Sequence, residues 1–287
     1  AALCAARYGI PRHYGDYDAL LLDPEIDAVY IALPNHLHVP LALRCAAAGK
    51  HVLCEKPLAL EPADIEALRD AAARYGVHIS EGFVHLHHPQ ARRLRAELID
   101  QALGTLRGGH GFSLRDPGNI RWRPEYGGGA LWDVGCYPVS AFVYYVGRRP
   151  SEVCATAVYA ESGVDATLSG WLRFGPGGPL GHFDCSMVAR LELAGDRAAV
   201  TLHEPFHADI DGRENGYTVQ PHDLGAEPRV VRLPPTDPFA CEIQAMEAAV
   251  LDGVPLPLSL GFSMDVAVTL SALHASAREG QPVTLPL

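Results

Sequence analysis

Apolar and polar residues follow a changing period along the first part of the chain. Residues 27–34 form a near-continuous apolar run of strand length, which is typical of a strand covered on both faces in a parallel sheet. A helical period follows over 39–48 and ends at Gly49, and a second short apolar strand covers 51–54. These elements predict a βαβ unit with a right-handed crossover.

The same alternation continues to about residue 82. An amphipathic helix is expected over 61–75, with Gly76 at its end, and a strand is expected over 77–81. Strands that alternate with helices in this way indicate a doubly wound α/β sheet. The sequence therefore predicts a Rossmann-like parallel sheet over residues 1–82.

The pattern changes after residue 82. The elements expected next are a helix at 89–102, a strand at 105–114, a loop rich in glycine and proline at 116–129, and a short helix at 131–145. Alternation with period two over 153–231 then favours an antiparallel sheet. Closing helices are expected at 242–251 and 263–279, with a final strand at 281–287. Residues 83–287 are thus predicted to form an α+β domain with a large, mainly antiparallel, open-faced sheet.

The composition is that of a globular protein, with 48% hydrophobic and 20% charged residues. The longest apolar stretch, 130–147, is interrupted by Asp133 and is too short to span a bilayer. The net charge is −11, and no basic run could follow a phosphate backbone. We therefore expect neither a membrane nor a nucleic acid as partner.

The seven cysteines include no C-x-x-C pair and lie mostly among apolar neighbours, as reduced structural thiols do. The first residues do not have the pattern of a signal peptide. These features favour the cytoplasm. The chain begins at Ala1 inside a predicted helix that Gly9 ends, so we expect the true start to lie upstream.

Polar residues gather at the predicted carboxyl ends of the strands, where ligands of open α/β sheets bind. They are Pro34, Asn35, His36, His38, Glu55 and Lys56. A lysine fixed between an acid and a proline can donate to a substrate hydroxyl or lower the pKa of a neighbouring acid. The alternative is a surface Lys56 paired with Glu55.

A glycine triplet at 127–129 precedes Asp133 and Tyr137. Glycines permit close approach of the backbone to a ligand or a tight entry into a helix, and residues four apart share one helical face. A phenol has a pKa near 10, so Tyr137 needs help to act as a base, and Lys56 could supply it. The alternative is an acidic residue near a helix N-terminus followed by a core tyrosine.

Other patterns carry less weight. His85, His87 and His88 would share a face in part if they lay on a strand, but no carboxylate or thiol completes a metal site, so we expect none. Arg123, before the glycine triplet, could contact a carboxamide or a substrate hydroxyl, or lie on the surface. No G-x-S-x-G elbow is present, so a Ser-His-Asp hydrolase is not supported.

Five segments, in order, resemble landmarks of the glucose-fructose oxidoreductase / inositol dehydrogenase / rhizopine-catabolism (Gfo/Idh/MocA) family, and the resemblance spans nearly the whole chain. They are residues 27–38, 48–57 (with Glu-Lys-Pro), 81–89, 127–137 and 237–287. The form Asp133-Val-Gly-Cys-Tyr137 is similar to the branch that contains glucose-fructose oxidoreductase, dimeric dihydrodiol dehydrogenase and NADP-linked xylose dehydrogenases.

The resemblance implies a hydride transfer between NAD(P), with NADP favoured, and an alcohol or hemiacetal of a sugar, polyol or dihydrodiol. Lys56 would hold the substrate hydroxyl and the nicotinamide region, Asp133 would orient or relay, and Tyr137 would be the acid/base. The residues implied to line the cofactor are Pro34, Asn35, His38, Glu55, Lys56 and Arg123. A homo-oligomer through the C-terminal sheet is also implied. A nicotinamide-assisted glycosidase and a non-catalytic dinucleotide-binding regulator remain open alternatives.

The sequence departs from the family pattern in two places. The family's first strand, G-x-G-x-x-G turn, first helix and second strand have no counterpart in these residues, and we expect them upstream of Ala1. The residue that selects NAD or NADP would lie in that part. Leu86 stands where related sequences often carry Arg, so one cofactor or substrate contact is not carried over.

Overall fold

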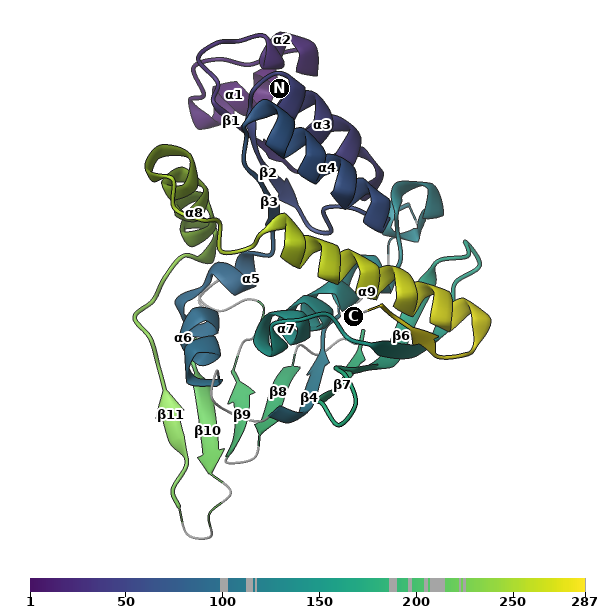
Figure 1. Cartoon of the computed structure of the whole chain (residues 1–287). Coiled ribbons are helices and arrows are strands. Elements are labelled where there is room, and N and C mark those ends of the chain that lie inside the picture. The colour runs from purple at the N-terminus through teal and green to yellow at the C-terminus, as the bar shows by residue number, and fades with distance from the viewer. Residues whose placement is uncertain are drawn as a thin grey trace.

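The computed structural model contains one sheet in each half of the chain (Figure 1). It describes residues 1–98, 103–111, 116, 118–185, 190–195, 198–203, 206, 215–221, 223 and 226–286. The first sheet has three parallel strands in the order β1 (Ala28–Ile31), β2 (His51–Glu55) and β3 (Ile79–Gly82). This confirms the predicted βαβ organisation.

Helices connect these strands and cover one face of the sheet. α3 (His38–Ala47) and α4 (Pro62–Tyr75) pack on strand residues such as Ile31 and Val52, and α4 ends at Gly76 in the left-handed conformation. Two short helices, α1 (Ala2–Tyr8) and α2 (Tyr17–Leu21), precede β1. The prediction that β1 is covered on both faces is wrong, because Tyr30 on its other face is 51% exposed.

The second sheet has nine strands in the order β11-β10-β9-β8-β4-β7-β6-β5-β12. Their bounds are β4 (Leu103–Gly109), β5 (Glu152–Tyr159), β6 (Asp165–Arg173), β7 (Leu180–Asp184), β8 (Arg190–Gly195), β9 (Ala198–Leu202), β10 (Tyr217–Pro221), β11 (Arg229–Val231) and β12 (Val283–Thr284). All neighbouring pairs are antiparallel except β4 and β7, which run parallel.

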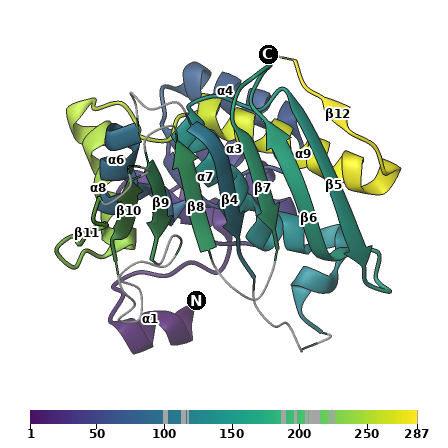
Figure 2. The same cartoon turned by 90° about the horizontal axis from the view of Figure 1, so that it is seen from below.

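One face of this sheet is covered by helices and the other is open. α7 (Cys136–Val146) and α9 (Leu260–Glu279) pack against the strands, and Figure 2 shows them behind the sheet. Along β6, Leu168 and Leu172 are buried while Thr167 is exposed. The fold is therefore a three-stranded, parallel, Rossmann-like sheet followed by a mainly antiparallel open-faced sheet, as the sequence predicts.

The connecting helices differ in detail from the prediction. The residues around His85 form a short helix, α5 (Val84–His87), so their interpretation as a strand is wrong. α6 (Pro89–Leu98) is described only to Leu98. Residues 99–102 of the predicted helix and residues 112–114 of the predicted strand lie outside the described residues. α8 (Pro238–Asp252) begins four residues earlier than expected because Asp237 caps it.

The predicted helix at 131–145 divides into two parts. A π-helical turn, η4 (Leu131–Gly135), comes first and continues directly into α7. π-Helical turns occur frequently at functional sites. Among the described residues, no helix combines the length and the apolar character required to cross a membrane.

Candidate active site

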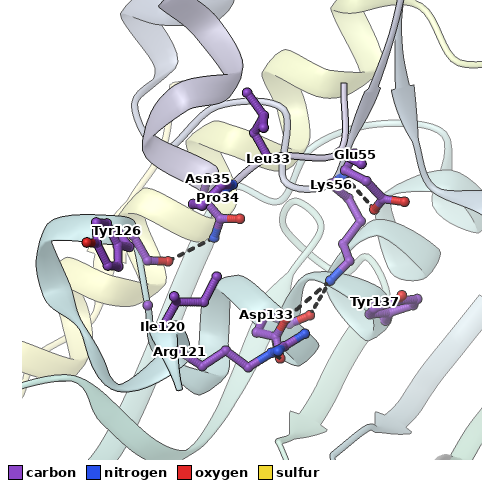
Figure 3. Close-up of a pocket in the computed structure, with 13 residues that line it drawn as sticks. Leu33, Pro34, Asn35, Glu55, Lys56, Ile120, Arg121, Tyr126, Asp133 and Tyr137 are labelled. Carbon is purple, nitrogen blue, oxygen red and sulfur yellow. Dashed lines mark hydrogen bonds and ion pairs between the residues drawn. The ribbon is translucent and has the colours of Figure 1, made fainter. Parts of the chain in front are cut away.

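A cavity of about 360 Å³ lies where the carboxyl ends of β1 and β2 face the C-terminal domain (Figure 3). It is lined by Ala32, Leu33, Pro34, Asn35, Glu55 and Lys56 from the first domain, and by Ile120, Arg121, Tyr126, Gly127, Gly128, Asp133 and Tyr137 from the second. This volume falls within the roughly 300–1,000 Å³ of ligand pockets, and its position is that of ligands in open α/β sheets.

Lys56 crosses the cavity from the end of β2 and joins the two domains. Its Nζ donates to the backbone carbonyl of Asp133 at 2.7 Å and lies 3.5 Å from the Asp133 carboxylate. The same Nζ lies 4.9 Å from the centre of the Tyr137 ring. Burial lowers the pKa of Lys56, but nearby Tyr137, Cys136, Asp133 and Glu55 raise it more, so the net shift is upward. Lys56, whose side chain is 12% exposed, is therefore a charged ammonium group.

The loop that carries Lys56 is held by buried polar contacts. The backbone N–H of Leu58 donates to Glu81 Oε1 at 2.8 Å. The His38 ring contacts the carbonyl oxygens of Pro57 at 2.8 Å and Leu33 at 2.7 Å, and so ties together the loops after β1 and β2. His38 is fully buried and does not line the cavity, and its expected contact with the cofactor stays a prediction.

Glu55 has its carboxylate fixed at the end of β2. One oxygen accepts the hydroxyl hydrogen of Tyr30, and the other accepts the backbone N–H of Lys56 at 3.2 Å. Burial and this carboxylate together raise the pKa of Tyr30. Glu55 lines the cavity where sequence reasoning placed it.

Asp133 lies between two cations. Arg121 Nε donates to its Oδ2 at 2.6 Å, while Lys56 Nζ lies on the side of Oδ1. By contrast, Arg123 is about half exposed, lies 3.5 Å from Glu125 and does not line the cavity. The arginine that lines the cavity is thus Arg121 and not Arg123. The sequence did not distinguish them, because both lie in the loop just before the glycine triplet.

The glycine triplet explains why Arg121 turns inward. Gly128 N–H donates to the carbonyl of Arg123 at 3.1 Å, and Gly129 N–H donates to that of Arg121 at 3.0 Å, so the chain folds back on itself. A Cβ on Gly128 would lie 2.4 Å from the Arg121 carbonyl oxygen, a distance that no side chain permits. The triplet therefore makes a tight backbone turn beside the cavity.

The two domains also meet at the edge of the cavity. Asn35 Nδ2 donates to the Gly127 carbonyl at 2.9 Å, and the rings of His36 and Tyr126 stack with their centres 4.9 Å apart. The Asn35 side chain therefore holds the glycine turn against the end of β1. Whether it also meets a cofactor stays a prediction.

The ring of Tyr137 is enclosed by other rings. His85, His110 and Phe206 lie with their centres 5.1, 4.7 and 5.4 Å from that of Tyr137. Burial raises the pKa of the Tyr137 phenol to about 12, although Lys56 lowers it in part. The phenol is therefore protonated at neutral pH.

The three histidines that suggested a metal site do not form one in the described part of the chain. His85 packs on Tyr137, and no group of three or more His, Cys, Asp or Glu side chains among the described residues could hold a metal ion.

The lining residues fit the nicotinamide end of NAD(P). Leu33 and Pro34 give an apolar wall at the end of β1, and Lys56 and Tyr137 offer polar hydrogens on the opposite side. A flat, weakly polar ring with a carboxamide and an adjoining alcohol matches such a mixed wall.

Comparison with known proteins matches both halves of the chain to one family. Residues 1–83 match the model described as "Oxidoreductase family, NAD-binding Rossmann fold", and residues 91–203 match "GFO/IDH/MocA C-terminal domain". D-xylose 1-dehydrogenase (NADP(+)) 2 of Haloferax volcanii is 34% identical, over 99% of this chain and 88% of that protein.

Two further relatives extend this picture. Trans-1,2-dihydrobenzene-1,2-diol dehydrogenase of Mus musculus is 35% identical over 65% of this chain and 57% of that protein. The crystal structure of aldose-aldose oxidoreductase from Caulobacter crescentus, complexed with glycerol, superposes with a TM-score of 0.87 at 27% identity. That match covers 99% of this chain and 88% of the other.

Proposed function

We propose, given that this chain belongs to the Gfo/Idh/MocA family of NAD(P)-dependent oxidoreductases, that it transfers hydride between the cofactor and an alcohol carbon of a sugar, polyol or dihydrodiol. The observation that carries this proposal is the placement of Lys56. Its ammonium group contacts Asp133 and the Tyr137 ring at once, inside a cavity at the strand ends. Such a cluster serves proton transfer at a secondary alcohol.

Tyr137, Lys56 and Asp133 have different roles in the proposed reaction. When bound, NAD(P) accepts or delivers the hydride. In the direction of reduction, the Tyr137 hydroxyl gives its proton to the substrate oxygen, and Lys56, which opposes the upward shift of the Tyr137 pKa, stabilises the phenolate that remains. In the direction of oxidation, Lys56 stabilises the phenolate that must take the proton. Asp133, held by Arg121, keeps Lys56 in place.

Substrate, cofactor choice and assembly are inferred from relatives and from the surface of the sheet. The named relatives act on D-xylose with NADP(+) and on dihydrobenzenediol, so we favour NADP and a cyclic sugar or diol. The open sheet face exposes apolar side chains such as Val158, which is 66% exposed, and this supports a homo-oligomer through that face. Light scattering on the purified protein would measure the number of subunits.

The test is a panel of alcohols. Purified protein is incubated with NADP or NAD and with D-xylose, other aldoses, inositol or a trans-dihydrodiol, and the formation of reduced cofactor is followed by absorbance. Alcohol-dependent NADPH formation supports the proposal. Release of nitrophenol from a nitrophenyl glycoside without net reduction would indicate a glycosidase instead. Tight dinucleotide binding without turnover of any compound would indicate a regulator and overturn the proposal.

A further inference from the structure

A bulge in β6 turns one carboxylate into the protein interior. Residues of β6 alternate between the open face, where Thr167 and Ser169 are exposed, and the core. In the pairing with β5 the register shifts by one residue, so Ala166 is left over between two successive pairs. A bulge of this kind re-aims the neighbouring side chain. Asp165, which regular alternation would place on the open face, is only 2% exposed.

The Asp165 carboxylate caps the turn that carries the candidate catalytic residues. Its Oδ2 accepts the backbone N–H of Leu131 at 2.6 Å. This amide begins η4, which holds Asp133 and leads into α7 with Tyr137. The first amides of a helix lack partners within the helix, and an acidic group satisfies them best.

The close approach of Asp165 also accounts for the third glycine of the triplet. Gly129 has a φ of +120°, and a Cβ at this position would lie 2.2 Å from Asp165 Oδ1. A side chain here would displace the carboxylate from the amides of η4. Gly129 and Asp165 therefore form one structural unit.

We propose that Asp165 is a positioning residue for the proposed hydride transfer. By fixing the start of η4, it sets the backbone carbonyl of Asp133 to which Lys56 donates, and it sets the entry of α7 that carries Tyr137. Burial raises the pKa of Asp165 to about 6, while its bonds to backbone amides oppose that shift. The inference rests on the proposed function for its effect on rate.

The test compares Asp165→Asn with Glu161→Gln, which removes the same charge from an exposed turn nearby. We expect kcat of Asp165→Asn to fall about ten-fold or more with KM changed less than about two-fold, since small displacements of reacting groups are costly. The wild-type kcat should also decline below about pH 6 as Asp165 takes a proton, and this part of the pH profile should be absent from the Asn variant. Glu161→Gln should match the wild type in rate and pH profile.

A second readout does not depend on turnover. Amide hydrogen exchange over residues 129–137 should be faster in Asp165→Asn than in the wild type and unchanged in Glu161→Gln. Gly129→Ala should act on the same unit, so its effect on kcat should be less than additive with that of Asp165→Asn. Unchanged exchange over 129–137, or a wild-type kcat and pH profile in a folded Asp165→Asn, would overturn the inference. A wild type inactive on every alcohol would refute the proposed function alone, because the exchange data would still decide the role of Asp165.

Discussion

Two clusters of polar side chains, one in the cavity between the domains and one under α8, differ in how their charges are compensated. In the cavity, the Asp133 carboxylate contacts the ammonium group of Lys56 and the guanidinium group of Arg121. Under α8, Glu242 lies 4.0 Å from His87, and neither facing atom has a hydrogen-bond partner among the described residues. In the first cluster, opposite charges are in contact. In the second, a buried carboxyl group and a buried imidazole face each other without a hydrogen bond between them.

The direction of each pKa shift follows from this difference. Burial, with the nearby Glu55 as a smaller cause, raises the pKa of Glu242 to about 8. Burial, with Arg92 as a smaller cause, lowers that of His87 to about 4. At neutral pH this pair is therefore uncharged rather than an ion pair. Lys56 is buried as well, but its anionic neighbours keep it charged. Burial alone thus does not mark a functional charge; the presence of opposite partners does.

The largest expected effect comes from removing the cation of the cavity cluster. Lys56→Met leaves Asp133 with Arg121 alone and removes the positive charge beside the Tyr137 ring. We expect kcat for NADPH formation to fall about a thousand-fold. The matched control is Lys50→Met, at the only other lysine of the sequence, which donates to the Asp23 carbonyl at 2.9 Å. It should lower Tm and keep kcat; an equal loss of kcat in both variants would contradict a special role for Lys56.

The next largest effect is expected from Glu242 in the second cluster, on the free energy of unfolding. The folded-state pKa of Glu242 lies above its ordinary value of 4.5, so the stability it contributes is present at pH 4.5 and lost as the pH rises through about 8. Glu242→Gln cannot lose that proton. Its free energy of unfolding should exceed that of the wild type by on the order of 4 kcal/mol at pH 9 and by much less at pH 5, because each unit of pKa shift corresponds to about 1.4 kcal/mol.

Urea denaturation at the two pH values measures this difference. Glu247→Gln removes an acid from the exposed side of the same helix, so it should show no such pH dependence. A Glu242→Gln variant whose advantage is the same at both pH values would show that Glu242 is not titrating in the folded protein.

The smallest expected effect is on kcat/KM, and it distinguishes the two arginines that precede the glycine triplet, Arg121 and Arg123. Arg121 donates to Asp133 in the cavity, whereas Arg123 lies beside Glu125 at the surface. We expect Arg121→Ala to lower kcat/KM about ten-fold, which corresponds to one charge-assisted hydrogen bond. Arg123→Ala should change kcat/KM by less than about two-fold. Steady-state kinetics with the best alcohol of the panel measures both, and the reverse order would return the cavity role to Arg123.

Much of the fold and part of the site followed from local patterns. The apolar runs before Pro34 and Glu55 indicated parallel strands, and the rule that ligands bind at strand ends then selected Lys56. The structure adds that Lys56 contacts both Asp133 and Tyr137. The need of a phenol for a nearby cation suggested that Lys56 meets Tyr137, and the packing of the two domains brings them together.

Two features of the site could not be predicted from the hydrophobic period or from the spacing of motifs along the chain. The turn of Gly128 and Gly129 onto the preceding chain decides that Arg121, and not Arg123, faces the cavity. Regular alternation along β6 predicts that the Asp165 side chain points to the open face of the sheet. The extra residue Ala166 in the bulge turns it into the interior instead. The partners of both features lie within ten residues along the chain, but the apolar and polar pattern does not show where a strand gains an extra residue or which carbonyl a glycine amide contacts.

The role of Tyr137 is tested most directly by a single-turnover reaction of wild type and Tyr137→Phe with saturating NADP and the best alcohol of the panel. NADPH fluorescence follows the hydride step, and a separate titration measures cofactor affinity. We expect Tyr137→Phe to bind the cofactor like the wild type, to melt cooperatively and to form NADPH at least about a hundred-fold more slowly. Equal rates in the two proteins would contradict the assignment of Tyr137 as the group that transfers the proton.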